Sequence, residues 1–199
     1  MNPVRLVIGG GIGSGKSQAG GLLAERGFTV LDADRAGHSI LEGDHPVARR
    51  VAERWPEAVT AGAIDRRVLG CIVFHDRDQL AELEAITHPA IRERIARWAR
   101  RAGSRPAALE IPILADLVDG RWLWVIIEAP LELRRERLRG RGMSDGDIDA
   151  RLASQPSRAE WLEAADYVIG NEGTRDQLGR ALDDVLARIR ASRRARPGR

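Results

Sequence analysis

Short apolar runs alternate with helical segments along most of the chain. The first two runs lie within residues 4–8 and 28–31. Nearly continuous apolar runs of this length are typical of parallel strands that are buried on both faces. Three later runs have the same character: 107–111, 123–127 and 167–169. The pattern predicts an α/β fold, with a five-stranded parallel sheet and helices on both of its faces.

The long interval between the second and third runs predicts a helical subdomain at about 35–105. This interval is too long for a single crossover helix. Asp65 precedes a helical segment and is expected to cap its N-terminus. His88-Pro89 indicates the entry of another helix, with proline at the first helical position and His88 as a cap or a packed ring. The remaining segments, 1–34 and 106–187, would form the core of one domain.

The positive charge is concentrated at the C-terminus. The chain has a net charge of +3, and residues 188–199 contain six arginines and no acidic residue, so residues 1–187 carry −3. A slightly acidic body does not suit specific nucleic-acid binding. We therefore expect a disordered, solvated tail over 188–199, with a weak polyanion-binding arm as the alternative.

The sequence predicts a cytoplasmic protein. Its apolar runs are far shorter than the roughly 20 residues of a membrane-spanning helix, and its beginning lacks the apolar stretch of a signal peptide. Cys71 is the single cysteine, so no internal disulfide can form and a reducing compartment is expected. The oligomeric state is left open.

The only lysine in the chain lies in a nucleotide-binding pattern. Among 32 basic residues, Lys16 is the one that is not arginine. It belongs to the sequence GGIGSGKS at 10–17, which contains the phosphate-loop pattern G-x-x-x-x-G-K-[ST]. An apolar run precedes the pattern and helical spacing follows it, which is the strand-loop-helix context that the pattern requires.

The residue types of this loop suit a nucleoside triphosphate with Mg²⁺. Glycines let the backbone N–H groups close around phosphate at the helix N-terminus. The slim lysine side chain can follow the phosphates, whereas the wider guanidinium of arginine cannot occupy the same groove. The Ser17 hydroxyl is a candidate Mg²⁺ ligand.

Three acidic residues lie at or just beyond the ends of predicted strands and are candidates for chemistry at the same sheet edge. Asp32 and Asp34 would lie on one side if the strand conformation continued through them. Either they cap the following helix, or at least one is the general base toward a hydroxyl acceptor. Glu110 is a candidate for the Mg²⁺ site, directly or through another ligand, with a structural carboxylate as the equal alternative.

A second cluster of arginines predicts a mobile lid at about 134–150. Arg134, Arg137 and Arg141 recur at spacings of three and four, which places them on one helix face. A cationic face ahead of a glycine-containing segment suits a lid over transferring phosphates, with an exposed helix as the alternative.

The chain resembles the dephospho-coenzyme A kinases over about residues 5–185. The resemblance rests on an ordered set of segments: GGIGSGKS at 10–17, LDAD at 31–34, GAIDRRVL at 62–69, ITHPAI at 86–91, IPIL at 111–114, RLASQ at 151–155 and ADYVIGN at 165–171. The phosphate loop alone is common to many enzymes, whereas the ordered set is specific. The resemblance implies a P-loop kinase domain at 1–187 that transfers the γ-phosphoryl group of ATP to the 3′-hydroxyl of dephospho-coenzyme A.

The resemblance also implies roles for individual residues. Asp34 would be the base, and Lys16 and Arg141 would stabilise the migrating phosphoryl group. ATP would be bound by Gly11, Gly13, Ser14, Gly15, Lys16, Ser17, Gln18, Arg137 and Asn171. The helical insertion would hold the acceptor, and the acceptor-binding residues would be Asp32, His38, Arg67, His88 and Pro112. Mg²⁺ would be held at Ser17 and Glu110.

Some positions depart from the family pattern, and two rival functions remain. Gly9 replaces the usual threonine, His38 the usual arginine and Arg134 the usual glutamine. One rival is a kinase acting on a nucleoside monophosphate or another small metabolite; the other is a non-catalytic ATP-binding protein. A GTPase is disfavoured, because the guanine-binding pattern Asn-Lys-x-Asp needs a lysine and the chain has none outside the phosphate loop.

Overall fold

The computed structural model describes residues 3–73, 76–115, 117–118 and 120–194. The chain divides into two compact units. The first contains residues 1–30, 104–114 and 121–199, and the second contains 31–103 and 115–120. Among the described residues, no helix is both long and apolar enough to cross a membrane.

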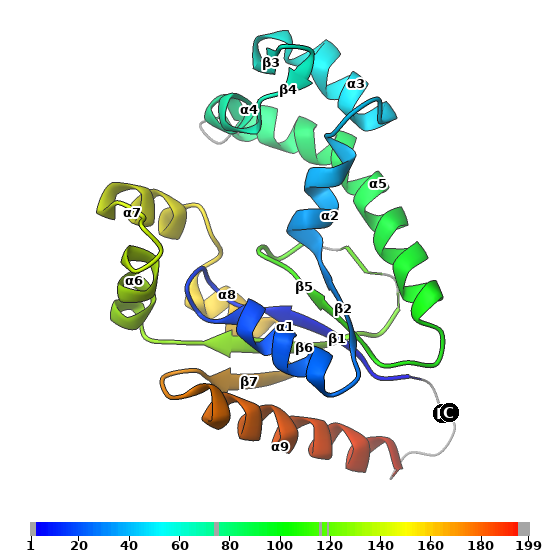
Figure 1. Cartoon of the computed structure of the whole chain (residues 1–199), viewed down its shortest axis with the longest axis vertical. Coiled ribbons are helices and arrows are strands. Elements are labelled where there is room, and N and C mark those ends of the chain that lie inside the picture. Colours follow the sequence, from blue (N-terminus) through cyan, green and yellow to red (C-terminus); the bar gives the residue numbers. More distant parts are fainter. Residues whose placement is uncertain (1–2, 74–75, 116, 119, 195–199) are drawn as a thin grey trace. The chain divides into compact units, whose positions relative to one another are not determined.

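The centre of the first unit is a sheet in which the described residues form five strands (Figure 1). The strands are β1 (Arg5–Gly9), β2 (Thr29–Asp32), β5 (Ala107–Glu110), β6 (Leu123–Glu128) and β7 (Tyr167–Gly170). Their order across the sheet is β2-β5-β1-β6-β7, and β1 pairs in parallel with both β5 and β6. β7 pairs in parallel with β6. The predicted five-stranded parallel sheet is confirmed.

One face of this sheet is covered by α1 (Lys16–Glu25) and α9 (Arg175–Arg194). Leu6 and Ile8 of β1 point to this face and belong to one apolar core with both helices. Figure 1 shows the two helices side by side along the sheet. Arg26, just after α1, joins them through Asp183 of α9 at 2.7 Å and through the Gly179 carbonyl at 3.0 Å.

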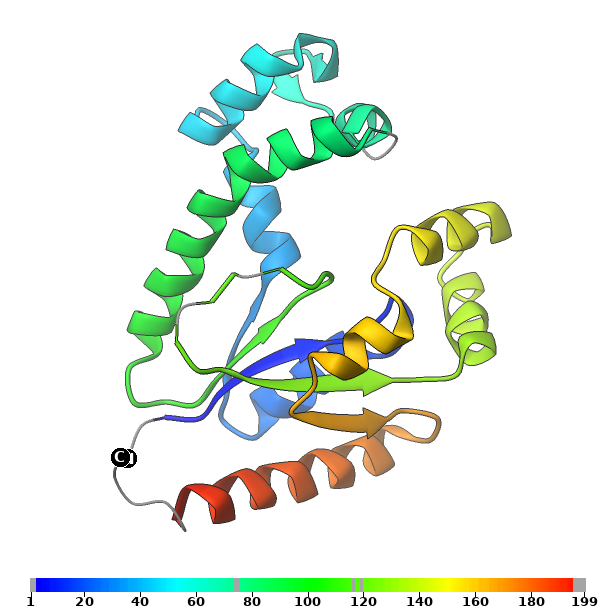
Figure 2. The same cartoon turned by 180° about the vertical axis from the view of Figure 1, so that it is seen from behind.

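The opposite face is covered by α8 (Arg158–Glu163), as Figure 2 shows from behind. Strand side chains alternate between faces, so Gly9 lies on the side opposite to Ile8. A Cβ atom on Gly9 would lie only 2.7 Å from the Trp161 ring and 2.7 Å from Ile126. The Trp161 ring therefore takes the space that a threonine at position 9 would need. With α1 and α9 on one face of the sheet and α8 on the other, the prediction of helices on both faces is confirmed.

The second unit is helical, with one short hairpin. Its helices are α2 (Ala33–Ile40), α3 (Pro46–Arg54), η1 (Pro56–Ala58), α4 (Arg66–Val73) and α5 (Arg77–Ala102). The hairpin of β3 (Val59–Thr60) and β4 (Ala63–Ile64) turns at Ala61 and Gly62, which both have positive φ angles. Trp55 is fully buried in this unit, and its indole N–H donates to Gln79 at 2.8 Å.

Two local predictions in the second unit had different outcomes. Asp65 caps α4 as predicted, because its carboxylate accepts from the backbone N–H groups of Arg67 and Val68. The predicted helix entry at His88-Pro89 is wrong, because both residues lie inside α5. Proline costs about 3 kcal/mol inside a helix. The apolar residues around it, such as Ile86 and Ile91, pack against the core of this unit and offset that cost.

The predicted disordered tail from residue 188 is also wrong as far as Arg194, where α9 ends. Ile189 is buried in the same core as Leu182, Val185 and Leu186. These residues follow the i, i+3, i+4, i+7 spacing of an apolar helix face, so burial in the core supports the helix through Ile189. Residues 195–199 of the predicted tail lie outside the described residues.

We expect Ile189→Ala to lower the free energy of unfolding by about 2–4 kcal/mol, because it removes a fully buried side chain and leaves a cavity. Urea denaturation followed by circular dichroism measures the change. The matched control is Ser192→Ala in the exposed part of the same helix, which should change stability by less than about 0.5 kcal/mol. Equal stability of the two variants would contradict the packing of α9 described here.

Candidate functional site

The phosphate loop, residues 10–17, connects the end of β1 to the first turn of α1. Gly10, Gly13 and Gly15 have positive φ angles of 135°, 79° and 104°. A Cβ atom at Gly10 would lie 2.2 Å from the Ile127 carbonyl oxygen, and one at Gly13 would lie 2.8 Å from the Arg134 carbonyl oxygen. Both the backbone conformation and the close approach of neighbouring segments therefore require glycine at these positions.

Lys16 is half-buried and folds back over this loop. Its ammonium group donates to the Gly10 carbonyl at 2.8 Å and to the Gly11 carbonyl at 3.4 Å. The nitrogen is thus held at the inner edge of the loop, between two carbonyl oxygens. A planar guanidinium is wider and carries several fixed N–H directions, so it cannot take the same place.

Ser17 and Glu110, the two residues predicted to hold Mg²⁺, lie together, and their role in binding the metal remains a prediction. The Ser17 hydroxyl donates to the Glu110 carboxylate at 2.7 Å. Mg²⁺ in nucleotide sites commonly uses one or two protein oxygens and completes its shell with water and phosphate oxygens, so this pair of oxygen donors fits it. No cluster of three or more His, Cys, Asp or Glu that could hold a metal occurs in the described part of the chain.

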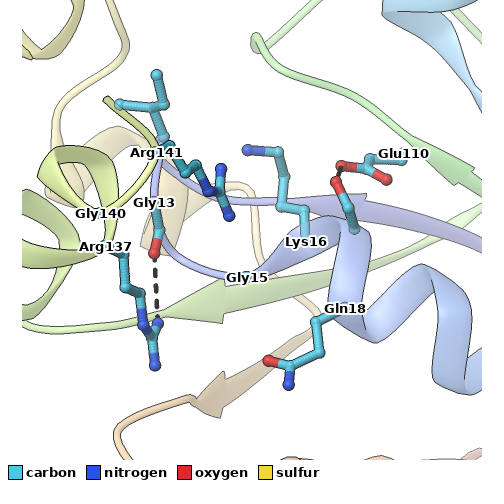
Figure 3. A pocket seen from close by; sticks show the side chains of 10 residues that line it. Gly13, Gly15, Lys16, Gln18, Glu110, Arg137, Gly140 and Arg141 are labelled. Carbon is cyan, nitrogen blue, oxygen red and sulfur yellow. Dashed lines mark hydrogen bonds between the residues drawn. The ribbon is translucent and has the colours of Figure 1, made fainter. Parts of the chain in front are cut away.

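A cavity of about 590 Å³ opens beside the loop, entirely within the first unit (Figure 3). Figure 3 shows the side chains of Lys16 and Arg141 extending toward the same space from opposite sides. Residues from the loop, the start of α1, the end of β5 and the end of α6 (Leu131–Arg139) line the cavity. They are Ile12, Gly13, Gly15, Lys16, Ser17, Gln18, Glu110, Arg137, Gly140 and Arg141. The arrangement concentrates positive charge at a glycine-rich loop.

Arg137 and Asn171, both predicted to bind ATP, contact the backbone of the phosphate loop. Arg137 donates to the Gly13 carbonyl at 3.3 Å and to the Asn171 carbonyl at 2.9 Å. The side-chain amide of Asn171 donates to the Ser14 carbonyl at 2.7 Å. The Ser14 hydroxyl and the Asn171 amide oxygen are buried without a hydrogen-bond partner among the described residues. Direct binding of ATP by Arg137 and Asn171 remains a prediction.

Sequence reasoning missed two residues that hold the apex of the loop. Arg134 donates from Nε to the Ile12 carbonyl at 2.7 Å, and Gln155 accepts from the Ile12 N–H at 2.6 Å. Burial lowers the pKa of the Arg134 guanidinium, with Glu128 acting in the opposite direction. The sequence marked Arg134 as part of a cationic face and as a departure from the family's usual glutamine, and Gln155 as part of the RLASQ segment at 151–155. None of these signals indicates a contact with Ile12.

The predicted lid region consists of α6 and α7 (Asp145–Ala153), which ion pairs tie together. Arg139 pairs with Asp145 at 2.7 Å, and Arg135 pairs with Asp149. Ser144 caps α7 by accepting from the Asp147 N–H. The arginines of α6 thus divide into two groups: Arg134 and Arg137 face the loop backbone, and Arg135 and Arg139 face acidic residues of α7. Movement of this region as a lid remains a prediction.

The two aspartates where β2 passes into α2 have different local roles. The strand ends at Asp32, whose carboxylate caps α2 by accepting from the backbone N–H groups of Asp34 and Arg35. The expectation that both carboxylates lie on one side of a continued strand is wrong, because Asp34 is already in the first turn of α2. The chain forms a helix here instead of continuing the strand, because the Asp32 cap satisfies backbone N–H groups that have no partner within the helix.

The Asp34 side chain is 61% exposed, and its carboxylate lies 3.4 Å from Nε2 of His38, one turn further along α2. Arg67 is exposed in the first turn of α4, and His88 is half-buried in α5. All these residues belong to the second unit, where α2 packs against α5. Pro112 belongs to the first unit, just after β5. The acceptor-binding roles of Asp32, His38, Arg67, His88 and Pro112 remain predictions.

The sequence matches a family model described as dephospho-CoA kinase over residues 4–177. A dephospho-CoA kinase of Deinococcus radiodurans is 39% identical to this chain, with coverage of 94% of this chain and 93% of the relative. One from Frankia casuarinae is 38% identical, with coverage of 94% and 84%. Both relatives match nearly the whole chain.

Solved structures agree with these matches. A Thermus thermophilus protein, TT1252, is 35% identical and superposes with a TM-score of 0.84, covering 95% of this chain and 99% of its own. A dephospho-CoA kinase from Campylobacter jejuni is 26% identical, with a TM-score of 0.65 and coverage of 92% and 96%. A shikimate kinase from Acinetobacter baumannii, at 15% identity and a TM-score of 0.51, shares the fold alone.

We expect Lys16→Arg to lower turnover roughly 10²-fold although the charge is kept, because the wider guanidinium cannot lie between the loop carbonyls. Steady-state kinetics with Mg-ATP measures the loss, and an unchanged melting temperature shows that the fold is kept. Near-normal turnover would contradict the steric argument.

Proposed function

Because the chain belongs to the dephospho-CoA kinase family, we propose that it transfers the γ-phosphoryl group of ATP to the 3′-hydroxyl of dephospho-coenzyme A. The products are coenzyme A and ADP. The observation that carries the proposal is the family match over residues 4–177 together with an intact phosphate loop, in which Lys16 and Arg141 border one cavity. ATP with Mg²⁺ is the proposed phosphoryl donor, and the enzyme is proposed to work in the cytoplasm.

Positioning and charge stabilisation are the main tasks of the first unit in this reaction. Phosphoryl transfer spreads negative charge over the oxygens of the migrating group, with the attacking and leaving oxygens roughly in line. Lys16 and Arg141 present two cationic side chains to the cavity (Figure 3). In a site that is partly shielded from water, fixed positive groups stabilise this charge more strongly than mobile solvent does.

Ser17 is the residue proposed to hold Mg²⁺, with Glu110 orienting its hydroxyl. The hydrogen bond of 2.7 Å between them fixes the Ser17 side chain at the start of α1. When bound, Mg²⁺ neutralises phosphate charge and helps to orient the terminal phosphate. Glu110 lines the same cavity, so its negative charge also favours a cation there.

Asp34 is proposed as the general base. Its carboxylate would accept the proton of the 3′-hydroxyl while that oxygen attacks the γ-phosphorus and the bond to the β-phosphate oxygen breaks. Its exposed side chain leaves it available to an acceptor, and its own helix places His38 next to it. Asp32, in contrast, is engaged as the cap of α2, which favours Asp34 as the base.

The second unit is the proposed acceptor side. Asp34, His38, Arg67 and His88 all lie on its helices. A cationic Arg67 and two histidines suit an acceptor that carries phosphate groups of its own, as dephospho-coenzyme A does. His38 is shorter than the arginine that the family usually has at this position, so we propose a weaker charge contact with the acceptor there.

A panel of acceptors tests the function directly. Purified protein with Mg-ATP is incubated separately with dephospho-coenzyme A, a nucleoside monophosphate and shikimate, and ADP formation is followed. We expect turnover with dephospho-coenzyme A and a product phosphorylated at the 3′-oxygen by phosphorus NMR. Turnover only with another acceptor would favour a different small-molecule kinase, and ATP binding without turnover would favour a non-catalytic nucleotide-binding protein.

We expect Asp34→Asn to lower kcat by about 10²–10⁴-fold with little change in ATP affinity, because the amide cannot accept the proton. Steady-state kinetics and calorimetric ATP binding separate the two quantities. Asp44→Asn is the matched control, since Asp44 is an exposed aspartate of the same unit that pairs with Arg49. Equal losses of kcat and ATP affinity in Asp34→Asn would assign Asp34 to nucleotide or metal binding instead.

A further inference from the structure

Three consecutive carbonyl groups of the phosphate loop are held by side chains from outside the loop. The donors come from α6 and from the residue that follows β7. Arg134 donates to Ile12 at 2.7 Å, Arg137 to Gly13 at 3.3 Å, and Asn171 to Ser14 at 2.7 Å. Figure 3 shows the contact of Arg137 with Gly13. These contacts direct the carbonyls of residues 12–14 toward α6 and Asn171.

The geometry of the peptide bond then fixes the direction of the next three amides. In a planar trans peptide, the N–H group of the following residue points opposite to the carbonyl. The amides of Gly13, Ser14 and Gly15 are therefore turned away from the side chains that hold the carbonyls. The Ser14 amide bonds to the Gly11 carbonyl at 3.1 Å within the loop, and Gly13 and Gly15 both line the cavity.

Ile12 is the start of this arrangement, because both of its backbone polar groups are occupied. Gln155, just beyond the end of α7, accepts from its N–H at 2.6 Å, and Arg134 donates to its carbonyl. The Arg134 guanidinium also lies against Gly11, where a Cβ atom would be 2.3 Å from a guanidinium nitrogen. The peptides on either side of Ile12 cannot rotate without breaking one of these two bonds.

We propose that Gln155 and Arg134 are positioning residues for phosphoryl transfer, which act through Ile12. By holding both sides of this residue, they keep the Gly13 and Gly15 amides directed into the cavity, where the phosphates of the nucleotide bind. Neither residue is among the described residues that line the cavity, in contrast to Arg137 and Arg141. The inference rests on the proposed use of ATP and extends it to residues outside the binding surface.

Arg134 acts here as a directional donor more than as a charge. Its side chain is half-buried, and burial lowers the pKa of its guanidinium, while the charge of Glu128 acts in the opposite direction. The contact with Ile12 uses Nε, the inner nitrogen, and places the planar group over Gly11. The loss of the donor, and not of one positive charge, should therefore be decisive.

Gln155→Met tests the inference without changing charge, because methionine keeps the length of the side chain and removes the acceptor. We expect about five- to tenfold weaker ADP binding by calorimetry, a similar loss of kcat/KM for ATP, and an unchanged KM for dephospho-coenzyme A. Ser154→Ala is the matched control, since the hydroxyl of this neighbouring residue donates to the Arg151 carbonyl one turn earlier and not to the phosphate loop. Wild-type ADP affinity in Gln155→Met, or an equal loss in the control, would overturn the proposal.

A second set of variants separates positioning from charge and from general stability. Arg134→Met should weaken ADP binding to a similar extent, whereas Arg135→Met, which removes the same charge from a residue paired with Asp149, should leave it within about twofold. Because Gln155 and Arg134 hold the same residue, the double variant should lose little more than the larger single loss. If the loss of ADP affinity in the double variant equals the product of the two single losses, the shared action through Ile12 is refuted. It is also refuted if the ADP affinities of the variants follow their melting temperatures alone.

ADP binding also separates a failure of the proposed kinase activity from a failure of the positioning role of Gln155 and Arg134. If the wild-type protein binds ADP and does not phosphorylate dephospho-coenzyme A, the proposed acceptor is wrong, while the comparison of ADP affinities still decides the role of Gln155 and Arg134. If turnover is normal and Gln155→Met binds ADP like the wild type, only the positioning role fails.

Discussion

A backbone that binds an anion through its N–H groups must place its carbonyl groups elsewhere. Every peptide has both, and a carbonyl oxygen facing a triphosphate would repel it. In this protein the carbonyls of residues 12–14 face Arg134, Arg137 and Asn171, and those of Gly10 and Gly11 accept from the Lys16 ammonium. The cavity side of the loop is thereby left to amides and cationic side chains. The positions of α6 and β7 in the first unit serve this arrangement.

The need to hold the loop carbonyls explains why neighbouring segments pack so closely against the phosphate loop. The loop glycines tolerate positive φ angles, and they also allow Ile127, Arg134 and Asn171 to approach the backbone at distances that no side chain would permit. Gly9, just before the loop, has the same function toward Trp161. A threonine at position 9 would displace the ring that covers this face of the sheet, so the departure from the family pattern is matched by packing within this chain.

The arginines of the segment 134–141 have different roles. A row of like charges on one helix would repel, and the structure relieves this by giving each side chain a different environment. Arg135 and Arg139 pair with acids of α7, Arg134 and Arg137 donate to backbone carbonyls, and Arg141 reaches the cavity. One cationic segment thus holds α7, orients the loop and supplies charge for the proposed reaction.

The sequence by itself determined the parts that depend on neighbouring residues. Apolar runs gave the five strands, the G-x-x-x-x-G-K-[ST] pattern gave the loop between β1 and α1, and the ordered motifs gave the family. Strands, caps and glycine turns are local, because each depends on side chains a few positions apart. Where local signals competed, they failed: Pro89 lies inside α5, and α9 continues to Arg194, since burial in a core outweighs a helix-breaking or charged residue.

Only the tertiary structure decided which distant side chains meet the loop. Ile12 is 122 residues from Arg134 and 143 from Gln155, and Ser14 is 157 from Asn171. No periodicity links such positions, because their meeting follows from the order β1-β6-β7 in the sheet and from the turn between α6 and α7. A pattern along the chain reports which groups are present, whereas a hydrogen bond needs two groups within about 3 Å in the right direction, and only the folded chain sets that distance.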